Sequence, residues 1–148
     1  MSGKLTDEQI AARIEHARAV NASVPPEKLV RGLARMLDLV PDAEPDEFTY
    51  PALNKTSRDR IFGGQIIAQA MMAAAKTVDP DKQVHSLHAY FLRGGNETLP
   101  LHFRVHRDFD GRAFSNRRVV LRQEGKVIFN LTASFHPPEQ GLSPPVPM

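Results

Sequence analysis

The feature that most constrains this chain is an uncharged run from Ile61 to Ala75, with the sequence IFGGQIIAQAMMAAA. It lies between Arg60 and Lys76, opens with a pair of glycines and continues with residues that favour helix. A helix at a protein surface usually shows one apolar stripe and one charged face. Because this run has no charged face, we predict a helix that is buried on nearly every side.

The residues that follow, from Val84 to His136, predict a succession of strands long enough to wrap such a helix. Apolar and polar residues alternate with a period of two, which is the pattern of a strand with one buried face. Turn signals separate the strands, at Asp110-Gly111 and Glu124-Gly125. The residues predicted to face inward are Leu101, Phe103 and Val105 in one strand and Val127, Phe129, Leu131, Ala133 and Phe135 in the last.

The N-terminal part predicts two short helices and then a polar linker. Thr6 and Gln9 form a capping-box pattern, and Pro26 suits the first turn of the second helix. Residues 41–46 are polar and rich in proline, and a first short strand begins at Phe48. From Pro137 onward the sequence is again proline-rich and cannot continue a central strand.

This element order predicts an α+β hotdog fold, in which an antiparallel sheet wraps a long central helix, here with an N-terminal helical extension. The predicted organisation is a helical arm and linker over residues 1–46, the hotdog domain over 47–136 and a proline-rich tail over 137–148. A length of 148 residues fits one domain with a core of its own.

Composition and missing motifs exclude several classes of function. The formal net charge of +2 is too small to indicate nucleic-acid binding. The absence of cysteine excludes disulfides, thiolate metal sites and a cysteine nucleophile. No apolar stretch reaches the roughly 18 residues of a membrane span. There is no G-x-S-x-G elbow, no Walker loop, no G-x-G-x-x-G and no hydratase-type Asp–His string.

Three strings in the sequence resemble the first half of the type II acyl-CoA thioesterases. They are RIFGGQIIAQAMMAA, VHSLHAYFLRGG and DGRAFSNRRVVLRQEGKVIFNLTASFHPPE, and the resemblance covers Leu29 to Gln140. It implies two hotdog domains in one enzyme that hydrolyses fatty acyl-CoA to free fatty acid and CoA, without a cofactor. It also implies that the catalytic Asp, Thr or Ser, and Gln lie in the second hotdog, so none has a counterpart in this sequence.

Gly63 and Gly64 are the first candidate site residues, as substrate-binding groups. Bare backbone amides at a helix start can hydrogen-bond a thioester carbonyl as negative charge develops on its oxygen. The alternative is that glycine only permits close packing of the helix against the sheet. Gln65 follows as a candidate catalytic residue that orients a water or the substrate amide. Its Gly-Gly-Gln string also occurs in peptide release factors, a match that chance explains best.

His85 is the second candidate catalytic residue. Strand alternation predicts that it shares a face with Leu87, Ala89 and Phe91, toward the helix, where it could serve as general base or hydrogen-bond donor. The alternative is a structural histidine. His88 falls on the opposite face, so the pair cannot bind one metal, and we predict no metal site. The basic residues considered for the phosphates of CoA are Arg58, Arg60, Arg104, Arg107, Arg117, Arg118 and Arg122.

The sequence leaves three functional interpretations open. The first is the N-terminal half of an acyl-CoA thioesterase, as a fragment or as one of two polypeptides. The second is a non-catalytic module that binds acyl-CoA or supports a catalytic subunit. The third is a self-sufficient homodimer that uses His85 and Gln65. In each case we expect pairing, as a homo-oligomer or with a second hotdog domain, because a single hotdog leaves a sheet edge unpaired. We also expect a cytoplasmic location, since no peroxisomal targeting signal is seen.

Overall fold

The computed structural model describes residues 6–52 and 60–141. By its internal contacts the chain divides into two compact units, Met1–Met36 and Leu37–Met148. No helix within the described residues is both long enough and apolar enough to cross a membrane.

The first unit contains the two predicted helices, α1 (Asp7–Ala22) and α2 (Pro26–Leu37). The predicted capping box is present at the start of α1. The Thr6 amide donates to Oε1 of Gln9 at 3.0 Å, and the Gln9 amide donates to Oγ1 of Thr6 at 3.3 Å. Pro26 is the first residue of α2, as predicted, because its missing N–H would have no helical partner there.

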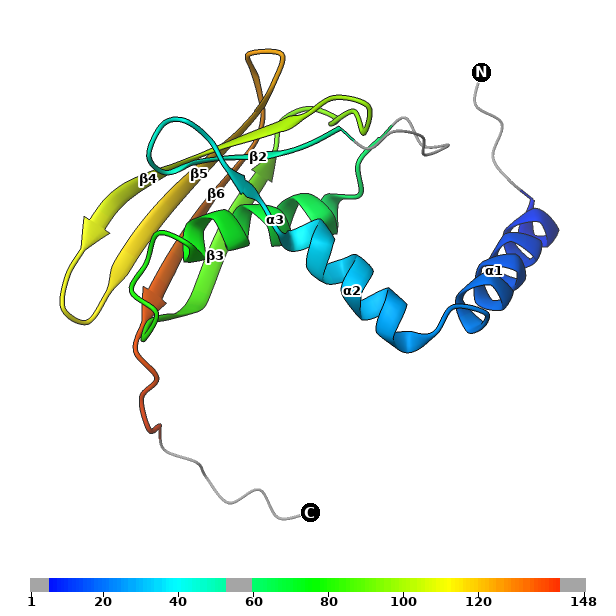
Figure 1. The fold of residues 1–148 in the computed structure, drawn as a ribbon, viewed down its shortest axis with the longest axis horizontal. Helices are drawn as coiled ribbons and strands as arrows, with labels where there is room; N and C mark the ends of the chain where they lie inside the picture. Colours follow the sequence, from blue (N-terminus) through cyan, green and yellow to red (C-terminus); the bar gives the residue numbers. More distant parts are fainter. Residues whose placement is uncertain (1–5, 53–59, 142–148) are drawn as a thin grey trace. The chain divides into compact units, whose positions relative to one another are not determined.

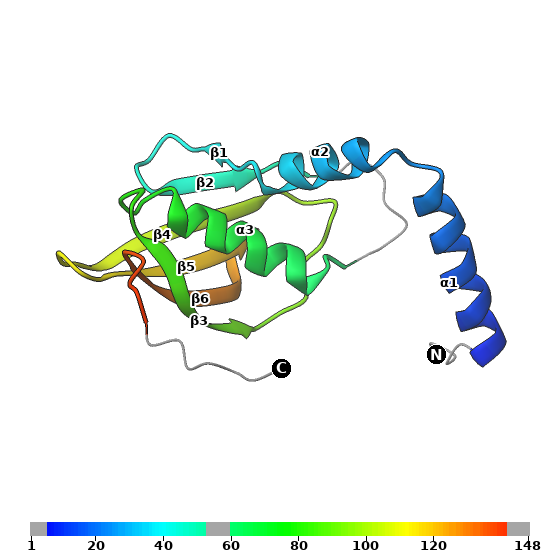
Figure 2. The ribbon, with the colours of Figure 1, turned by 90° about the horizontal axis from the view of Figure 1, so that it is seen from below.

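The second unit is one antiparallel sheet with the helix α3 (Gly63–Ala75) lying in its curve, as Figures 1 and 2 show. The strands follow the spatial order β1-β2-β4-β5-β6-β3, so β3 forms a free edge. Their bounds are β1 (Val40–Pro41), β2 (Glu47–Tyr50), β3 (Gln83–Phe91), β4 (Leu101–Asp110), β5 (Ser115–Gln123) and β6 (Lys126–His136). The predicted arrangement of helix and sheet is confirmed.

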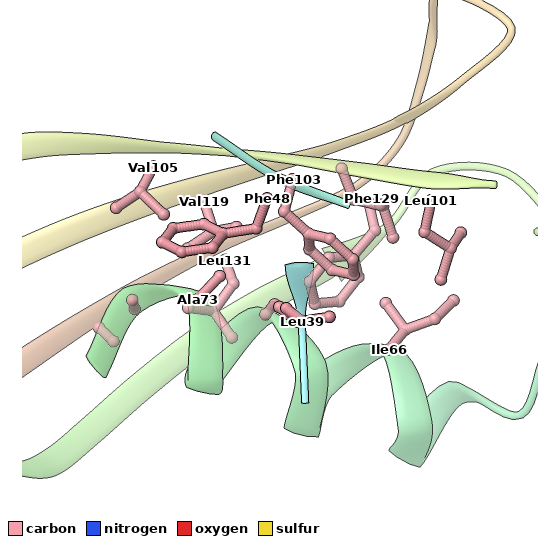
Figure 3. Close-up of a cluster of buried hydrophobic side chains, with 14 of the residues drawn as sticks. Leu39, Phe48, Ile66, Ala73, Leu101, Phe103, Val105, Val119, Phe129 and Leu131 are labelled. Carbon is pink, nitrogen blue, oxygen red and sulfur yellow. The ribbon is translucent and has the colours of Figure 1, made fainter. Parts of the chain in front are cut away.

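The core lies between α3 and the inner face of the sheet (Figure 3). Because alternate side chains of a strand point to the same face, Phe103, Leu121, Phe129 and Leu131 all lie on this inner face. Each of them is almost fully buried. Small residues on α3 let the backbone of the helix approach the sheet closely. The buried residues of the helix are Ile66, Gln69, Ala70, Ala73 and Ala74.

The prediction that α3 is buried on nearly every side is wrong. The sheet covers one side of the helix, and Gly64, Met72 and Ala75 on the helix are exposed. Phe62, just before the helix, is 69% exposed. The absence of charge in this run therefore gives the chain an uncharged outward surface, in addition to a buried one.

Two short-range details differ from the sequence prediction. Val40-Pro41 pairs with Thr49 and Phe48 as strand β1, although Pro41 was assigned to the linker. In β6 a register shift opposite Leu121 and Arg122 turns Ile128 inward, so Ile128 is buried and Val127 is only half-buried. The predicted turn at Glu124-Gly125 is confirmed, with φ of 47° and 73°, the left-handed values that a two-residue hairpin needs.

Candidate functional site

A cavity of about 460 Å³ opens beside the first turn of α3. Ile66 and Gly95 are its buried floor, whereas Arg60 and Arg93 are exposed at its rim. Ile61, Phe91 and Leu92 provide further apolar surface. The cavity thus joins an apolar interior to a cationic mouth, and its complete lining is Arg60, Ile61, Gly63, Ile66, Phe91, Leu92, Arg93, Gly94 and Gly95.

The start of α3 presents two bare backbone donors, of which Gly63 lines this cavity and Gly64 follows it in the helix. Phe62 caps the helix with an extended backbone, φ −65° and ψ 128°, and supplies no side-chain cap. The first amide with a helical acceptor is that of Gln65, which donates to the Phe62 carbonyl at 3.1 Å. Within residues 6–52 and 60–141, the N–H groups of Gly63 and Gly64 have no acceptor. They lie at the positive end of the helix dipole and suit an oxygen that carries negative charge.

Gly63 also allows the helix to begin close to the end of β3. A Cβ atom at Gly63 would lie 3.1 Å from Cζ of Phe91, which is tighter than most packed contacts. Gly95 is similar, since a Cβ there would lie 3.0 Å from Cδ1 of Ile61 and 3.2 Å from Cδ1 of Ile128. The packing explanation for the first glycine therefore has a geometric basis, and it is compatible with a binding role for the same backbone.

Gln65 is not part of this cavity. It lines a separate space of about 10 Å³, which is about the least that can hold one water molecule. Tyr50 and Glu97 line the same space, and burial raises the pKa of the Tyr50 hydroxyl above its ordinary value. The structure thus separates Gln65 from the pocket at Gly63, so the two predicted roles do not meet at one site.

The prediction that His85 faces the helix is wrong. A β-bulge between Val84 and Ser86 interrupts the alternation of β3. Leu87 and Phe91 still face the core, but the His85 ring lies on the other face of the sheet. There Nε2 of His85 lies 2.8 Å from Oγ of Ser134, and its ring centroid lies 4.6 Å from that of His136. A local bulge cannot be read from strand periodicity, and His85 does not line the cavity.

Most of the arginines considered from sequence have structural partners. Arg104 pairs with Glu47 at 2.8 Å, Arg107 with Asp46 at 2.7 Å, Arg117 with Asp110 at 2.7 Å and Arg118 with Asp108 at 3.0 Å. Arg122 donates to the carbonyl of Gly125. Arg58 lies outside the described residues. Of the considered arginines that the structure describes, Arg60 alone lines the cavity at the start of α3.

Arg93 is the functional candidate that the sequence reasoning missed. It follows β3 directly and precedes Gly94-Gly95, so a cation beside a glycine pair at a strand end was the available signal.

In the part of the chain that the structure describes, no three His, Cys, Asp or Glu side chains gather as a metal site requires.

A curved antiparallel sheet around one long helix, with a pocket where that helix begins, defines a hotdog domain. This chain belongs to the family described as the acyl-CoA thioesterase N-terminal domain, which it matches over residues 52–136.

Individual relatives agree with this assignment. Human acyl-coenzyme A thioesterase 8 is 53% identical over 76 residues, which are 51% of this chain and 24% of that protein. The peroxisomal acyl-coenzyme A thioester hydrolase 1 of Saccharomyces cerevisiae is 33% identical over 106 residues, 70% of this chain and 30% of the relative. The chain therefore spans about a quarter to a third of these relatives, at 24% and 30% of their lengths.

Solved structures show the same relationship. The acyl-CoA thioesterase II TesB2 of Mycobacterium marinum aligns with a TM-score of 0.68 and 38% identity, over 79% of this chain and 42% of that one. The uncharacterized protein PH1136 of Pyrococcus horikoshii aligns with a TM-score of 0.56 at 15% identity, over 64% of this chain and 75% of that one, and shows the fold alone.

Proposed function

We propose that this domain is one half of an acyl-CoA thioester hydrolase, which converts fatty acyl-CoA and water to free fatty acid and CoA. The observation that carries the proposal is the pair of acceptor-free N–H groups at the start of α3, where Gly63 lines the 460 Å³ cavity and Gly64 is the next residue of the helix. Membership of the thioesterase family supports the choice of an acyl-CoA over other carbonyl substrates.

In this proposal the thioester carbonyl accepts hydrogen bonds from the amides of Gly63 and Gly64. Water adds to the carbonyl carbon, negative charge gathers on the carbonyl oxygen, and collapse breaks the C–S bond and releases the thiol. Donors fixed in place before the reaction stabilise that oxygen, and each typically contributes about 10²–10³ in kcat. The apolar cavity surface of Ile61, Ile66 and Phe91 would contact the acyl group.

We infer that the water is activated by groups other than the described residues of this cavity. Among the described residues that line it, the titratable side chains are Arg60 and Arg93, and neither guanidinium can act as a general base near neutral pH. We propose that a second hotdog domain supplies the Asp, the Thr or Ser, and the Gln that the family resemblance implies. The interpretation of the chain as a self-sufficient homodimer relied on His85 and Gln65 as catalytic residues. Neither residue lines the cavity, so this interpretation is not favoured.

The pairing surface proposed for the second domain is the free edge of β3 with the outward side of α3. Leu87 and Phe91 of β3 are 46% and 53% exposed although both face inward in register with core residues of β6. Phe62 and Met72, before and on α3, are exposed apolar side chains as well. An unpaired strand edge with exposed apolar side chains favours pairing with another strand. A second hotdog domain, or a second copy of this chain, would cover it.

A non-catalytic acyl-CoA-binding module is the second candidate, and it is favoured because the described residues of the cavity lining include no general base. A thiol-release assay separates the two, with a clean background because the chain has no cysteine. The purified chain is assayed alone and then with the second hotdog domain of a related thioesterase. Turnover only in the mixture supports the half-enzyme. Binding of acyl-CoA without turnover in either sample supports the binding module and contradicts our proposal.

A cytoplasmic location belongs to the same proposal, because a chain without cysteine is compatible with a reducing compartment. Fluorescence imaging of the tagged full-length gene product tests it, and accumulation in an organelle would contradict it.

A further inference from the structure

The rim of the cavity carries two arginines, Arg60 and Arg93, that form no ion pair with any acidic side chain in the described part of the chain. Arg60 and Arg93 line the cavity, and neither has a carboxylate partner among the residues that the structure describes. This distinguishes them from Arg104, Arg107 and Arg118 on the sheet, each of which forms an ion pair. Within residues 6–52 and 60–141, the positive charge at the mouth of this pocket is therefore unbalanced.

The two guanidinium groups approach the rim from different elements. Arg60 precedes α3, and its Nε lies 3.7 Å from the point where a Cβ on Gly94 would stand. Arg93 follows β3, and its Nη1 donates to the carbonyl of Val127 at 2.6 Å. One N–H of Arg93 is thus held by the sheet, while its other N–H groups remain available to a ligand. Gly94 leaves room for the Arg60 side chain to lie against the backbone.

The pocket below these arginines is apolar, so its ligand has an apolar part and an anionic part. We propose that Arg60 and Arg93 bind the phosphate groups of the CoA moiety while the acyl end enters the cavity, an inference that rests on the function proposed above. A diphosphate carries two negative charges and balances both guanidinium groups. A carboxylate carries one negative charge and would balance only one guanidinium group. Guanidinium also matches phosphate oxygens through paired N–H donors.

A free fatty acid, like acyl-CoA, has an apolar chain and an anionic group. The test must therefore distinguish binding of acyl-CoA from binding of free fatty acid. Isothermal titration of the full chain uses three probes with the same acyl length. They are a non-hydrolysable thioether analogue of acyl-CoA, the corresponding acyl-pantetheine without phosphates, and the free fatty acid. The variants are Arg60→Gln, Arg93→Gln and the double variant, with Arg60→Lys as the variant that retains charge.

Arg112→Gln is the matched control, since Arg112 is exposed, does not line the cavity and lies in the loop between β4 and β5. Because Arg60 and Arg93 are exposed, we expect every variant to keep the circular dichroism spectrum and melting temperature of the parent.

We expect the double variant to bind the thioether-CoA analogue at least about tenfold more weakly, since each charge-assisted contact is among the stronger hydrogen bonds. Its affinity for acyl-pantetheine should stay unchanged, Arg60→Lys should retain part of the affinity, and Arg112→Gln should change nothing. Raising the salt concentration should weaken binding of the CoA analogue only.

Equal losses for the CoA and pantetheine probes, or a loss confined to the fatty acid, would overturn the assignment of the phosphates but leave the proposed hydrolase intact. A parent chain that binds none of the acyl-CoA analogue would overturn both.

Discussion

The guanidinium of Arg117, in the middle of the sheet, is hydrogen-bonded to Thr77, just beyond the end of α3. Its Nε donates to Oγ1 of Thr77 and its Nη2 to the Thr77 carbonyl, each at 2.9 Å. The same side chain donates to Asp110 and to the carbonyls of Phe109 and Asn116, and it is 1% exposed. One buried cation thus joins the end of the central helix to the β4–β5 hairpin.

Replacing Arg117 with methionine should therefore be costly to stability. The change would leave the Thr77 carbonyl and its neighbours without their donors inside the protein. We expect a loss of about 3–5 kcal/mol in the free energy of unfolding, measured by urea denaturation. Arg112→Gln serves as the control, with an expected change within about 0.5 kcal/mol for an exposed side chain. A methionine variant as stable as the parent would show that the network contributes nothing to folding.

The free energy of unfolding should decrease as the pH is lowered, in two separate pH windows. Hydrogen bonds from Arg107 hold the pKa of Asp46 below its ordinary value of 3.8. Burial, with Arg118 and Arg104 nearby, lowers the pKa of His106 below 6.5. In both cases the unfolded chain takes up the proton first as the pH falls, so acidification destabilises the fold. The His106 contribution disappears from pH 6.5 downward through its folded pKa, and the Asp46 contribution below pH 3.8.

The measurement is the urea midpoint as a function of pH. His106→Gln should remove the loss in the upper window, and Asp46→Asn should remove part of the loss in the lower one. A parent protein that became more stable between pH 6.5 and pH 5 would contradict the sign worked out for His106.

The free edge of β3 should drive association. We expect the parent chain to sediment as a concentration-dependent oligomer, and Leu87→Lys to shift it to monomer without unfolding it, since Leu87 is 46% exposed. Phe109→Lys is the matched control, because Phe109 is a similarly exposed apolar residue on β4 rather than on the edge. If both variants associate like the parent, β3 is not the pairing surface.

A pair of substitutions at Gly63 isolates the proposed backbone donor. Alanine and proline both add the Cβ that meets Phe91, but only proline removes the N–H. Proline is tolerated at the first helical position, and the extended backbone of Phe62 suits the residue before a proline. In the enzyme completed by a second hotdog domain, we expect kcat of Gly63→Pro to be about 10²–10³ below that of Gly63→Ala. Equal rates would remove the Gly63 amide from the mechanism.

Much of the fold follows from local sequence patterns. The uncharged run located α3 to within two residues at its start and correctly at its end, alternation identified the inward residues of β4, and the capping box marked the start of α1. Each of these signals depends on residues only a few positions apart, where backbone geometry dictates which side chains share a face.

The errors arise where distant residues decide the outcome. Whether α3 is covered depends on how far the sheet curves around it, which no property of the run itself specifies. The face of His85 was reversed by one bulge, and Thr77 lies 40 residues from its partner Arg117. Arg60 and Arg93 are recognisable as a pair only after the end of β3 is placed beside the start of α3.

The central claim is that acyl-CoA occupies the pocket at the start of α3, and amide chemical shifts test it most directly. Glycine amides occupy a sparse region of the NMR spectrum, and a chain of 148 residues is well suited to the method. The labelled chain is titrated with a non-hydrolysable thioether analogue of acyl-CoA. We predict saturable shifts at Gly63, Gly64, Gly94 and Gly95, with Gly32, Gly111 and Gly125 unmoved. Shifts confined to the second set, or none at saturating ligand, would contradict the account.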